Sequence, residues 1–179
     1  MNIPDIYDYL IASRRKLWAA LEALPDEVLD RHLLQGELFH SVRDLVFHIA
    51  IVEDGWVNMD IRAQETALEG FPELKDEGPM DVRTSLAELL RYWQAVEAKT
   101  LDYLPTLSAE DLRRVVRPED WCGLPFTVDG LLWHVMIHEM RHTAQIVALL
   151  RTQGVEPPTL DLLFYLADRE IKRLGGEGL

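Results

Sequence analysis

Residues 127–151 read TVDGLLWHVMIHEMRHTAQIVALLR and hold the histidine pattern that decides the fold. His134, His138 and His142 follow one another at four-residue steps. Because each residue turns an α-helix by about 100°, this spacing drifts by only about 40° per step and keeps the imidazoles on one stripe. Thr127 is expected to cap the N-terminus of this helix, and Gly154 is expected to end it. The stretch therefore predicts one long helix with a histidine face.

The rest of the chain carries the same helical periodicity, with almost no alternating strand pattern. Further helices are predicted over residues 5–24, 41–63 and 81–104, and a shorter one opens at Thr159. Short connections join the first two long helices and the last two, whereas a Gly/Pro-bearing segment follows residue 63. This pattern favours an all-α, antiparallel four-helix bundle with an additional C-terminal helix, and it permits one crossover. All 179 residues are expected to form a single domain.

Composition narrows the class of function. The formal net charge is -13, and so acidic a surface repels phosphate backbones, so no nucleic-acid partner is expected. No apolar stretch approaches the roughly 18 residues that span a bilayer, so no membrane partner is expected. The first residues lack a signal-peptide pattern, and the single cysteine, Cys122, leaves no internal disulfide. The chain is expected to be cytoplasmic and to act on a small-molecule substrate.

The histidine helix predicts ligands for one divalent metal ion. His134 and His142 lie roughly 12 Å apart along the axis, too far to share an ion with zinc–nitrogen bonds of about 2.0–2.1 Å. Neighbours at i and i+4 can converge on one ion. The pair is either His134 with His138 or His138 with His142. The second pair is preferred because HEMRH has the HExxH spacing known from zinc sites.

A third ligand must then come from another helix, and His48 is the preferred donor. It lies at the margin of the apolar face of the helix predicted over 41–63, about 60–80° from the centre of that face. A margin position points toward a cleft between helices. His32 and His40 lie in polar loop segments and are weaker candidates. The predicted metal ligands are therefore His48, His138 and His142.

Three further residues are candidates to support these ligands. Asp44 stands one turn before His48 and is a candidate to orient its imidazole, although helix capping explains it more simply. Glu53 is a candidate carboxylate near the site, with a solvated helix position as the default. His134 is a candidate hydrogen-bond partner of the site or a core residue.

The HExxH spacing also suggests a zinc protease. Such an enzyme would use Glu139 as general base and commonly a further ligand downstream, where the chain has no histidine and Glu170 is the nearest carboxylate considered. Strand signals for substrate binding are missing, so a protease is not favoured. Cys122 is either a reactive thiol or, as preferred, an ordinary loop cysteine. The tryptophans either wall a substrate pocket or fill the core. They are Trp18, Trp56, Trp93, Trp121 and Trp133.

Residues 41–56, SVRDLVFHIAIVEDGW, and residues 131–154, LLWHVMIHEMRHTAQIVALLRTQG, together resemble the DinB/YfiT-like metalloenzyme family. This family is unrelated to the DNA polymerase sometimes given the same name. The resemblance implies a four-helix bundle of up-down-down-up connectivity that is often a homodimer. The family's metal histidines map onto His48, His138 and His142, and the metal is commonly zinc or nickel. Several relatives transfer or exchange groups with a low-molecular-weight thiol.

The predicted ligand set indicates a catalytic metal. Three imidazoles without a thiolate leave a coordination position open, which is the catalytic pattern. An ion there lowers the pKa of bound water, or binds a thiol as thiolate and presents it as nucleophile. We expect a metal-dependent enzyme acting on small molecules, either a thiol-dependent transferase or a hydrolase. The alternative is a non-catalytic stress-response protein in which the metal only stabilises the bundle.

The histidine helix carries a second apolar stripe, roughly opposite the histidines. It consists of Leu132, Met136, Met140, Val147 and Leu150. A helix with two apolar faces must be covered on both. Either the C-terminal helix or a symmetric partner chain could cover the second, and a homodimer is predicted.

Overall fold

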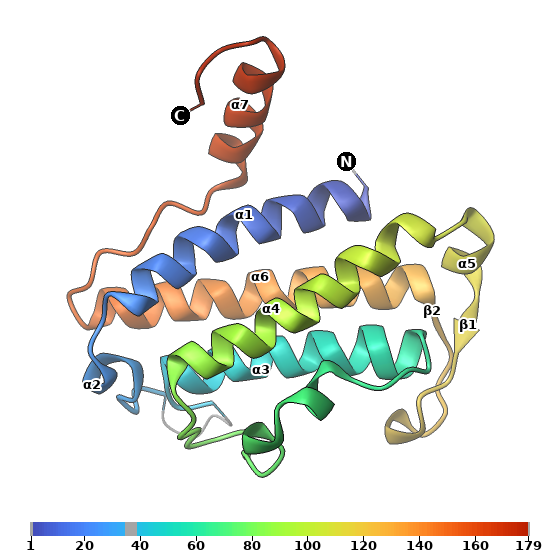
Figure 1. Ribbon diagram of the computed structural model, residues 1–179, viewed down its shortest axis with the longest axis horizontal. Helices are drawn as coiled ribbons and strands as arrows, with labels where there is room; N and C mark the ends of the chain where they lie inside the picture. Colours follow the sequence, from blue (N-terminus) through green and yellow to red (C-terminus); the bar gives the residue numbers. More distant parts are fainter. Residues whose placement is uncertain (1, 35–38, 179) are drawn as a thin grey trace.

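The computed structural model describes residues 2–34 and 39–178 and shows a bundle of long helices (Figure 1). These are α1 (Ile3–Glu22), α3 (Val42–Asp54), α4 (Leu86–Tyr103) and α6 (Val128–Thr152). Helices α1 and α6 run in one direction, and α3 and α4 run in the other. The long connection after α3 is the crossover that makes two consecutive helices parallel. The predicted all-α four-helix bundle is confirmed, with the up-down-down-up connectivity that the family resemblance implies.

Side-chain caps set where these helices begin. The Ser41 hydroxyl accepts a hydrogen bond from the backbone nitrogen of Asp44, and the Asp44 carboxylate accepts one from the backbone nitrogen of Ser41. Thr127 caps α6 as predicted. The predicted start of the third long helix near Asp81 is wrong, because Ser85 caps α4 and Asp81 has a φ of 58°. A left-handed residue cannot continue an α-helix.

Short elements join the long helices. They are α2 (Asp26–Leu29), α5 (Ala109–Arg113), the strands β1 (Val115–Val116) and β2 (Phe126–Thr127), and single 3₁₀ turns at Ala67–Gly70, Pro72–Leu74, Leu104–Thr106 and Glu119–Trp121. The strands are antiparallel, with Val115 opposite Thr127, and they lie next to the start of α6. Two-residue strands are too short to show an alternating pattern, so the sequence did not predict them.

Helix α3 continues as a π-helix over Gly55–Ile61. The helix predicted over residues 41–63 is therefore continuous in space but changes its hydrogen-bonding period. A π-helical turn is wider than an α-helical turn and is frequent at functional sites. Here it carries Trp56, which lines a cavity described below.

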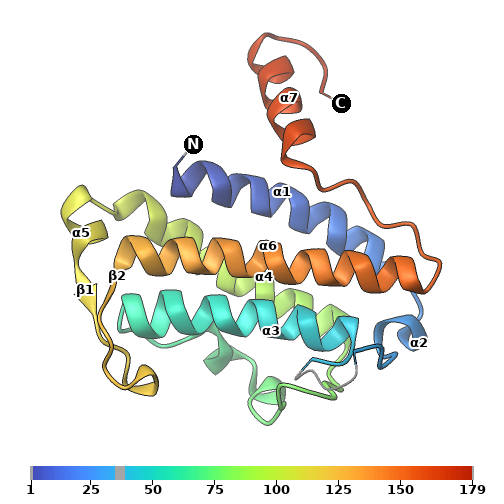
Figure 2. The same ribbon diagram turned by 180° about the vertical axis from the view of Figure 1, so that it is seen from behind.

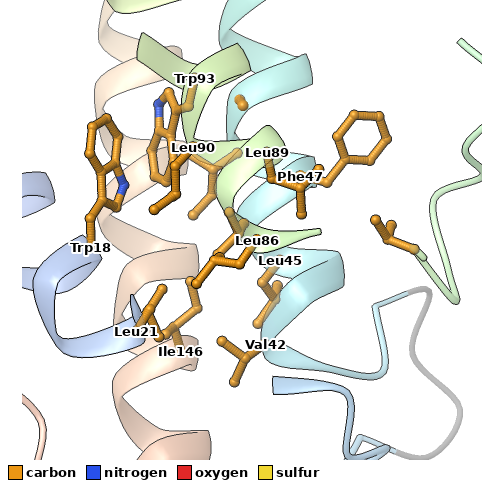
Figure 3. Packing of buried hydrophobic residues seen from close by; sticks show 14 of the residues in the cluster. Trp18, Leu21, Val42, Leu45, Phe47, Leu86, Leu89, Leu90, Trp93 and Ile146 are labelled. Carbon is orange, nitrogen blue, oxygen red and sulfur yellow. The ribbon is translucent and has the colours of Figure 1, made fainter. Parts of the chain in front are cut away.

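The core lies between the four helices (Figure 3). One cluster includes Trp18, Leu21, Leu45, Leu89, Trp93 and Ile146. A second cluster packs the first half of α1 against α6 and includes Leu10, Leu132 and Met136. Leu132, Met136 and Leu150 of the second apolar stripe are each 0% exposed. Part of the stripe is therefore buried within one chain, whereas Met140 and Val147 are half-buried and line a cavity beside α1, and the homodimer stays a prediction.

The C-terminal helix α7 (Leu162–Arg173) lies apart from the bundle in both views (Figures 1 and 2). It begins after the cap Asp161, not at Thr159 as predicted. The Tyr9 hydroxyl donates to the Leu160 carbonyl at 2.6 Å, and Arg169 pairs with Asp5 at 3.1 Å. These contacts attach α7 to α1. Among the described helices, none is long and apolar enough to cross a membrane.

Candidate metal centre

The predicted histidine trio meets between α3 and α6. One ring nitrogen each from His48, His138 and His142 lies within 4.8 Å of the others. The ring of His48 is 4.7 Å from the rings of both His138 and His142, centroid to centroid. The ring centroids of His138 and His142, the i, i+4 pair on α6, are 4.3 Å apart. The structure therefore brings together the three side chains that were predicted to share an ion, with His138 and His142 as the pair.

Helix packing produces this convergence. Helices α3 and α6 are antiparallel neighbours, so one residue of α3 faces two successive turns of α6 (Figure 2). His48 is half-buried, between the fully buried Phe47 and Ile49, and His142 is only 5% exposed. The margin position predicted for His48 thus places its ring in the seam between the helices, where it is partly shielded from water.

The geometry and the donor set fit a transition-metal ion. The Nε2 atoms of His48 and His138 are 3.0 Å apart. Two nitrogens around a tetrahedral ion with bonds of about 2.0–2.1 Å lie roughly 3.3 Å apart, so a small shift accommodates an ion. Three imidazoles suit zinc, nickel, copper or iron. With three protein ligands, at least one coordination position stays open.

Burial keeps these imidazoles neutral. Desolvation, followed by the nearby His142, lowers the pKa of His48 to about 4. The same two causes lower the pKa of His138 to about 3. Desolvation also lowers the pKa of His142. At neutral pH each ring therefore offers a lone pair without first losing a proton, which is the state that a metal ion requires.

Two residues that the sequence analysis did not assign complete the surroundings of the trio. Gln145 Oε1 lies 2.6 Å from His142 Nδ1, and a hydrogen bond donated by that nitrogen leaves Nε2 free for an ion. Phe39 stacks on the ring of His48 at 3.8 Å and meets His142 edge-on at 5.9 Å. Gln145 could have been found from its i+3 spacing after His142. Phe39 precedes the helix in a polar segment and carried no signal.

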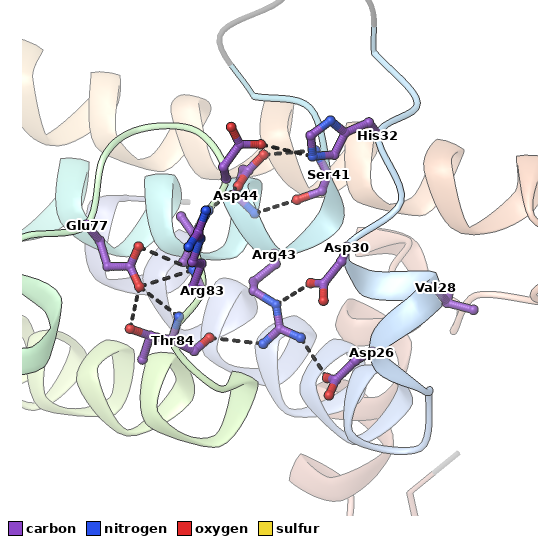
Figure 4. Close-up of polar contacts among 12 residues, drawn as sticks. Asp26, Val28, Asp30, His32, Ser41, Arg43, Asp44, Glu77, Arg83 and Thr84 are labelled. Carbon is purple, nitrogen blue, oxygen red and sulfur yellow. Dashed lines mark hydrogen bonds and ion pairs between the residues drawn. The ribbon is translucent and has the colours of Figure 1, made fainter.

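Asp44 does not orient His48. Its Oδ2 accepts hydrogen bonds from the backbone nitrogens of His40 (3.0 Å) and Ser41 (3.1 Å), and its Oδ1 accepts one from Val82 (3.0 Å). Figure 4 shows this carboxylate at the start of α3. The simpler explanation, helix capping, is the one that the contacts support, and Asp44 also ties the connection before α4 to α3.

Glu53 and Glu139 belong to a buried charge network in which both carboxylates pair with Arg14 of α1. Arg14 donates to Glu139 at 2.7 and 2.5 Å, to Glu53 at 2.7 Å and to Glu97 at 3.2 Å. The Tyr7 hydroxyl donates to Glu53 at 2.6 Å. Glu53 is 1% exposed, so the expectation of a solvated position is wrong. Because Arg14 holds Glu139, the general base required by a zinc protease is missing from the trio.

An apolar cavity of about 560 Å³ lies one helical turn from the trio. Its walls include Trp56, Trp121, Pro125, Phe126, Leu131 and His134. The exposed ring of His134 is 5.6 Å from that of Trp56 and 5.7 Å from that of His138, so it is neither a core residue nor a member of the trio. His134 therefore connects the cavity to the trio.

Four of the five tryptophans divide between the two predicted roles, and the partly buried Trp133 packs against the second core cluster. Trp18 and Trp93 pack against each other in the core at 5.3 Å. Trp56 and Trp121 line the cavity, with their ring centroids 5.8 Å apart.

Cys122 follows Trp121 and is exposed in a left-handed turn with a φ of 54°. A second, larger cavity of about 680 Å³ lies between α1, α6 and the segment before α7, and none of the three histidines lines it.

Comparisons with known proteins agree with this architecture. The model of the DinB family matches residues 1–173. YfiT from Bacillus subtilis, described as "a probable metal-dependent hydrolase with an unusual four-helix bundle topology", is similar with a TM-score of 0.65 and 21% identity, over 86% of this chain and 89% of that one. A DinB-like protein from Bacillus cereus is similar with a TM-score of 0.56 and 21% identity, over 84% and 94%. A conserved protein from Enterococcus faecalis is similar with a TM-score of 0.60 and 21% identity, over 84% of this chain and 96% of that one. No curated protein matches.

Proposed function

This chain belongs to the DinB family, and we propose that it is a metal-dependent enzyme acting on small molecules, with His48, His138 and His142 holding the ion. The observation that carries this proposal is the convergence of three neutral imidazoles from two helices beside an apolar cavity. A ligand set that leaves a coordination position open is typical of catalytic metal sites. The description of Bacillus subtilis YfiT as a probable metal-dependent hydrolase supports the same class of reaction.

When bound, such an ion lowers the pKa of a water or thiol ligand and so supplies a nucleophile at neutral pH. The side chains around it have separate tasks. Gln145 fixes the ring of His142, and Phe39 shields the ring of His48 from water. Desolvation lowers the pKa of His134, so this imidazole is neutral and can accept a proton at the boundary between trio and cavity.

The cavity indicates the chemical class of the substrate. Aromatic and aliphatic side chains form most of its wall, and among the described residues that line it none is Lys, Arg, Asp or Glu. Such a wall favours an uncharged, partly apolar group. With that group in the cavity, an adjoining carbonyl or other electrophilic carbon would lie near the trio. We therefore propose hydrolysis of a small apolar ester or amide as the reaction.

Transfer to a low-molecular-weight thiol is the second candidate. Within the part of the chain that the structure describes, no carboxylate is grouped with the trio, and Glu139 is held by Arg14. Hydrolysis commonly uses a carboxylate base, whereas a thiol has a pKa of about 8.5 and ionises readily next to a cation. The thiol sulfur would bond to the electrophilic carbon as the bond from that carbon to its leaving group breaks. The thiol proton would pass to His134 or to solvent, and the leaving group would depart with the bonding electron pair and take up a proton.

The first test is the metal content of untagged protein, measured by mass spectrometry. His48→Ala and His142→Ala are compared with wild type, and His134→Ala is the matched control because it removes a nearby histidine outside the trio. We expect near-stoichiometric metal in wild type and in the control, and its loss in both ligand variants. Wild-type protein that stays metal-free after incubation with zinc or nickel would contradict the proposal.

The second test is turnover of apolar aryl esters by the metal-loaded protein, with and without added thiol. Hydrolysis predicts turnover without thiol, and the second candidate predicts turnover only with it. Trp121→Ala should raise KM more than it lowers kcat, because the exposed Trp121 contributes to binding. Full metal occupancy without turnover under either condition would favour the non-catalytic alternative, and turnover that persists after metal removal would refute a metal-dependent reaction.

A further inference from the structure

A second group of ligand-type side chains lies at the end of the bundle where α3 begins. One ligand atom each from His32, His40 and Asp81 lies within 4.8 Å of the others. His32 Nε2 is 3.0 Å from Asp81 Oδ1, and the rings of His32 and His40 are 5.0 Å apart. We propose that these three residues bind a second divalent metal ion, best matched by zinc, that stabilises this end of the fold.

The backbone holds the three segments in place. The Leu33 nitrogen donates to the His40 carbonyl at 2.9 Å, which keeps the two histidine-bearing segments side by side. Asp44, which is 1% exposed, accepts from the His40 nitrogen with one oxygen and from the Val82 nitrogen with the other, each at 3.0 Å. One buried carboxylate thus fixes the chain at His40 and next to Asp81. Ligands arranged before binding lose less conformational entropy when the ion arrives.

One local feature is accounted for by an ion at this position. His40 Nδ1 is buried and has no hydrogen-bond partner among the described residues. An unpaired buried polar atom is destabilising, and coordination through this nitrogen would offset that cost.

The chemistry of the group favours zinc. Two imidazoles and a carboxylate are all zinc ligands, and water can complete a four-coordinate ion. The side chains of His32 and Asp81 are 57% and 58% exposed, and a cavity of about 370 Å³ leads to them, so an ion has direct access. The net charge of -13 also attracts cations.

The consequence of binding is a cross-link between three parts of the chain. His32 precedes α3 by a loop, His40 adjoins its cap, and Asp81 belongs to the connection before α4. An ion that binds only the folded chain raises its stability by mass action. It also holds His40, whose neighbour Phe39 lies on the ring of His48. The second ion therefore fixes the segment that covers the trio.

The test counts zinc ions per chain by equilibrium dialysis of full-length, metal-stripped protein at micromolar free zinc. The double variant His32→Gln/Asp81→Asn removes two exposed ligands, and asparagine tolerates the left-handed backbone at position 81. His134→Ala is the matched control. Circular dichroism checks that the variants remain folded, and thermal unfolding is followed with and without zinc.

We expect wild type and control to bind one more zinc ion than the double variant, and the double variant to lose part of the zinc-induced rise in Tm. An equal zinc count in wild type and double variant would overturn the proposal, whatever that count is. The test is separable from that of the histidine trio, because His138→Ala removes an ion from the trio and leaves the ion at His32, His40 and Asp81 in place.

Discussion

Replacement of Arg14 by methionine tests the buried charge network most directly. The side chain of Arg14 is 1% exposed, and it is the shared partner of three carboxylates. Glu53, Glu97 and Glu139 are themselves only 1%, 4% and 3% exposed. Arg14→Met keeps most of the side-chain volume but leaves these carboxylates without their central cation. The substitution therefore isolates the charge from the packing.

The expected loss follows from the cost of an uncompensated buried charge. Removing one partner of a buried ion pair costs about 3–5 kcal/mol. Protonation of the freed carboxylates limits the loss, and burial already raises the pKa of Glu139. Arg15, which also pairs with Glu97, retains one contact. We expect Arg14→Met to lower the free energy of unfolding by about 3–5 kcal/mol, a large share of the roughly 5–15 kcal/mol of a typical domain.

Glu139→Gln is the matched control. It keeps the shape of the side chain and removes one of three negative charges, while Arg14 retains Glu53 and Glu97. The lost charge-assisted hydrogen bonds are partly offset by weaker carboxylate repulsion, so we expect a loss of about 1–2 kcal/mol. Metal binding should not change, because Glu139 faces the network and not the trio.

Urea unfolding in the presence of a chelator, followed by far-UV circular dichroism, measures both variants without a contribution from metal. A loss below about 1 kcal/mol in Arg14→Met, at an unchanged m-value, would refute the reasoning that the network needs its cation. Loss of metal in Glu139→Gln would instead show that this carboxylate acts at the trio.

Two further predictions concern the histidine trio. Metal-free protein should lose stability as the pH falls from about 6.5 toward about 4, because His48 and His138 take up protons in the unfolded chain while burial keeps them neutral in the folded one. Chemical unfolding across this range should show a weaker pH dependence in His48→Asn/His138→Asn, and equal slopes would contradict the lowered pKa values. Gln145→Leu should weaken zinc affinity about 10–100-fold, since the ring of His142 loses its orienting acceptor. Competition against a chromophoric chelator measures this, and an affinity matching wild type would exclude an orienting role.

The local features of this chain could be predicted because they depend on neighbours in sequence. Helical periodicity and the caps Ser41 and Thr127 placed the starts of α3 and α6. The spacing of His138 and His142 predicted a pair on one face, and rotation placed His48 at a margin. These predictions hold because an α-helix has a fixed angle and rise per residue. The start of α4 failed because Ser85 competes with an equally plausible start at Asp81.

The buried network carried a sequence signal that could not be interpreted alone. Arg14 falls between Leu10 and Leu17 on the apolar stripe of α1, and Glu139 falls between buried residues of α6. A single charged residue at such a position looks like an exception to the pattern. Only when the four helices pack does Arg14 become the shared partner of Glu53, Glu97 and Glu139, and buried ions are stable only when paired.

What the sequence by itself determined is the bundle class, the helix faces and the histidines on each face, because each follows from residues a few positions apart; the contact of His48 with His138, 90 positions away, depends on helix packing. The tertiary structure alone decided which contacts join distant segments. It directed Glu139 to Arg14 and away from the trio, used Asp44 to tie Val82 to α3, and placed Trp121 beside Trp56. Each of these contacts joins residues at least 38 positions apart in the chain. No local periodicity encodes such separations; they arise when the helices pack and each polar group must find a partner.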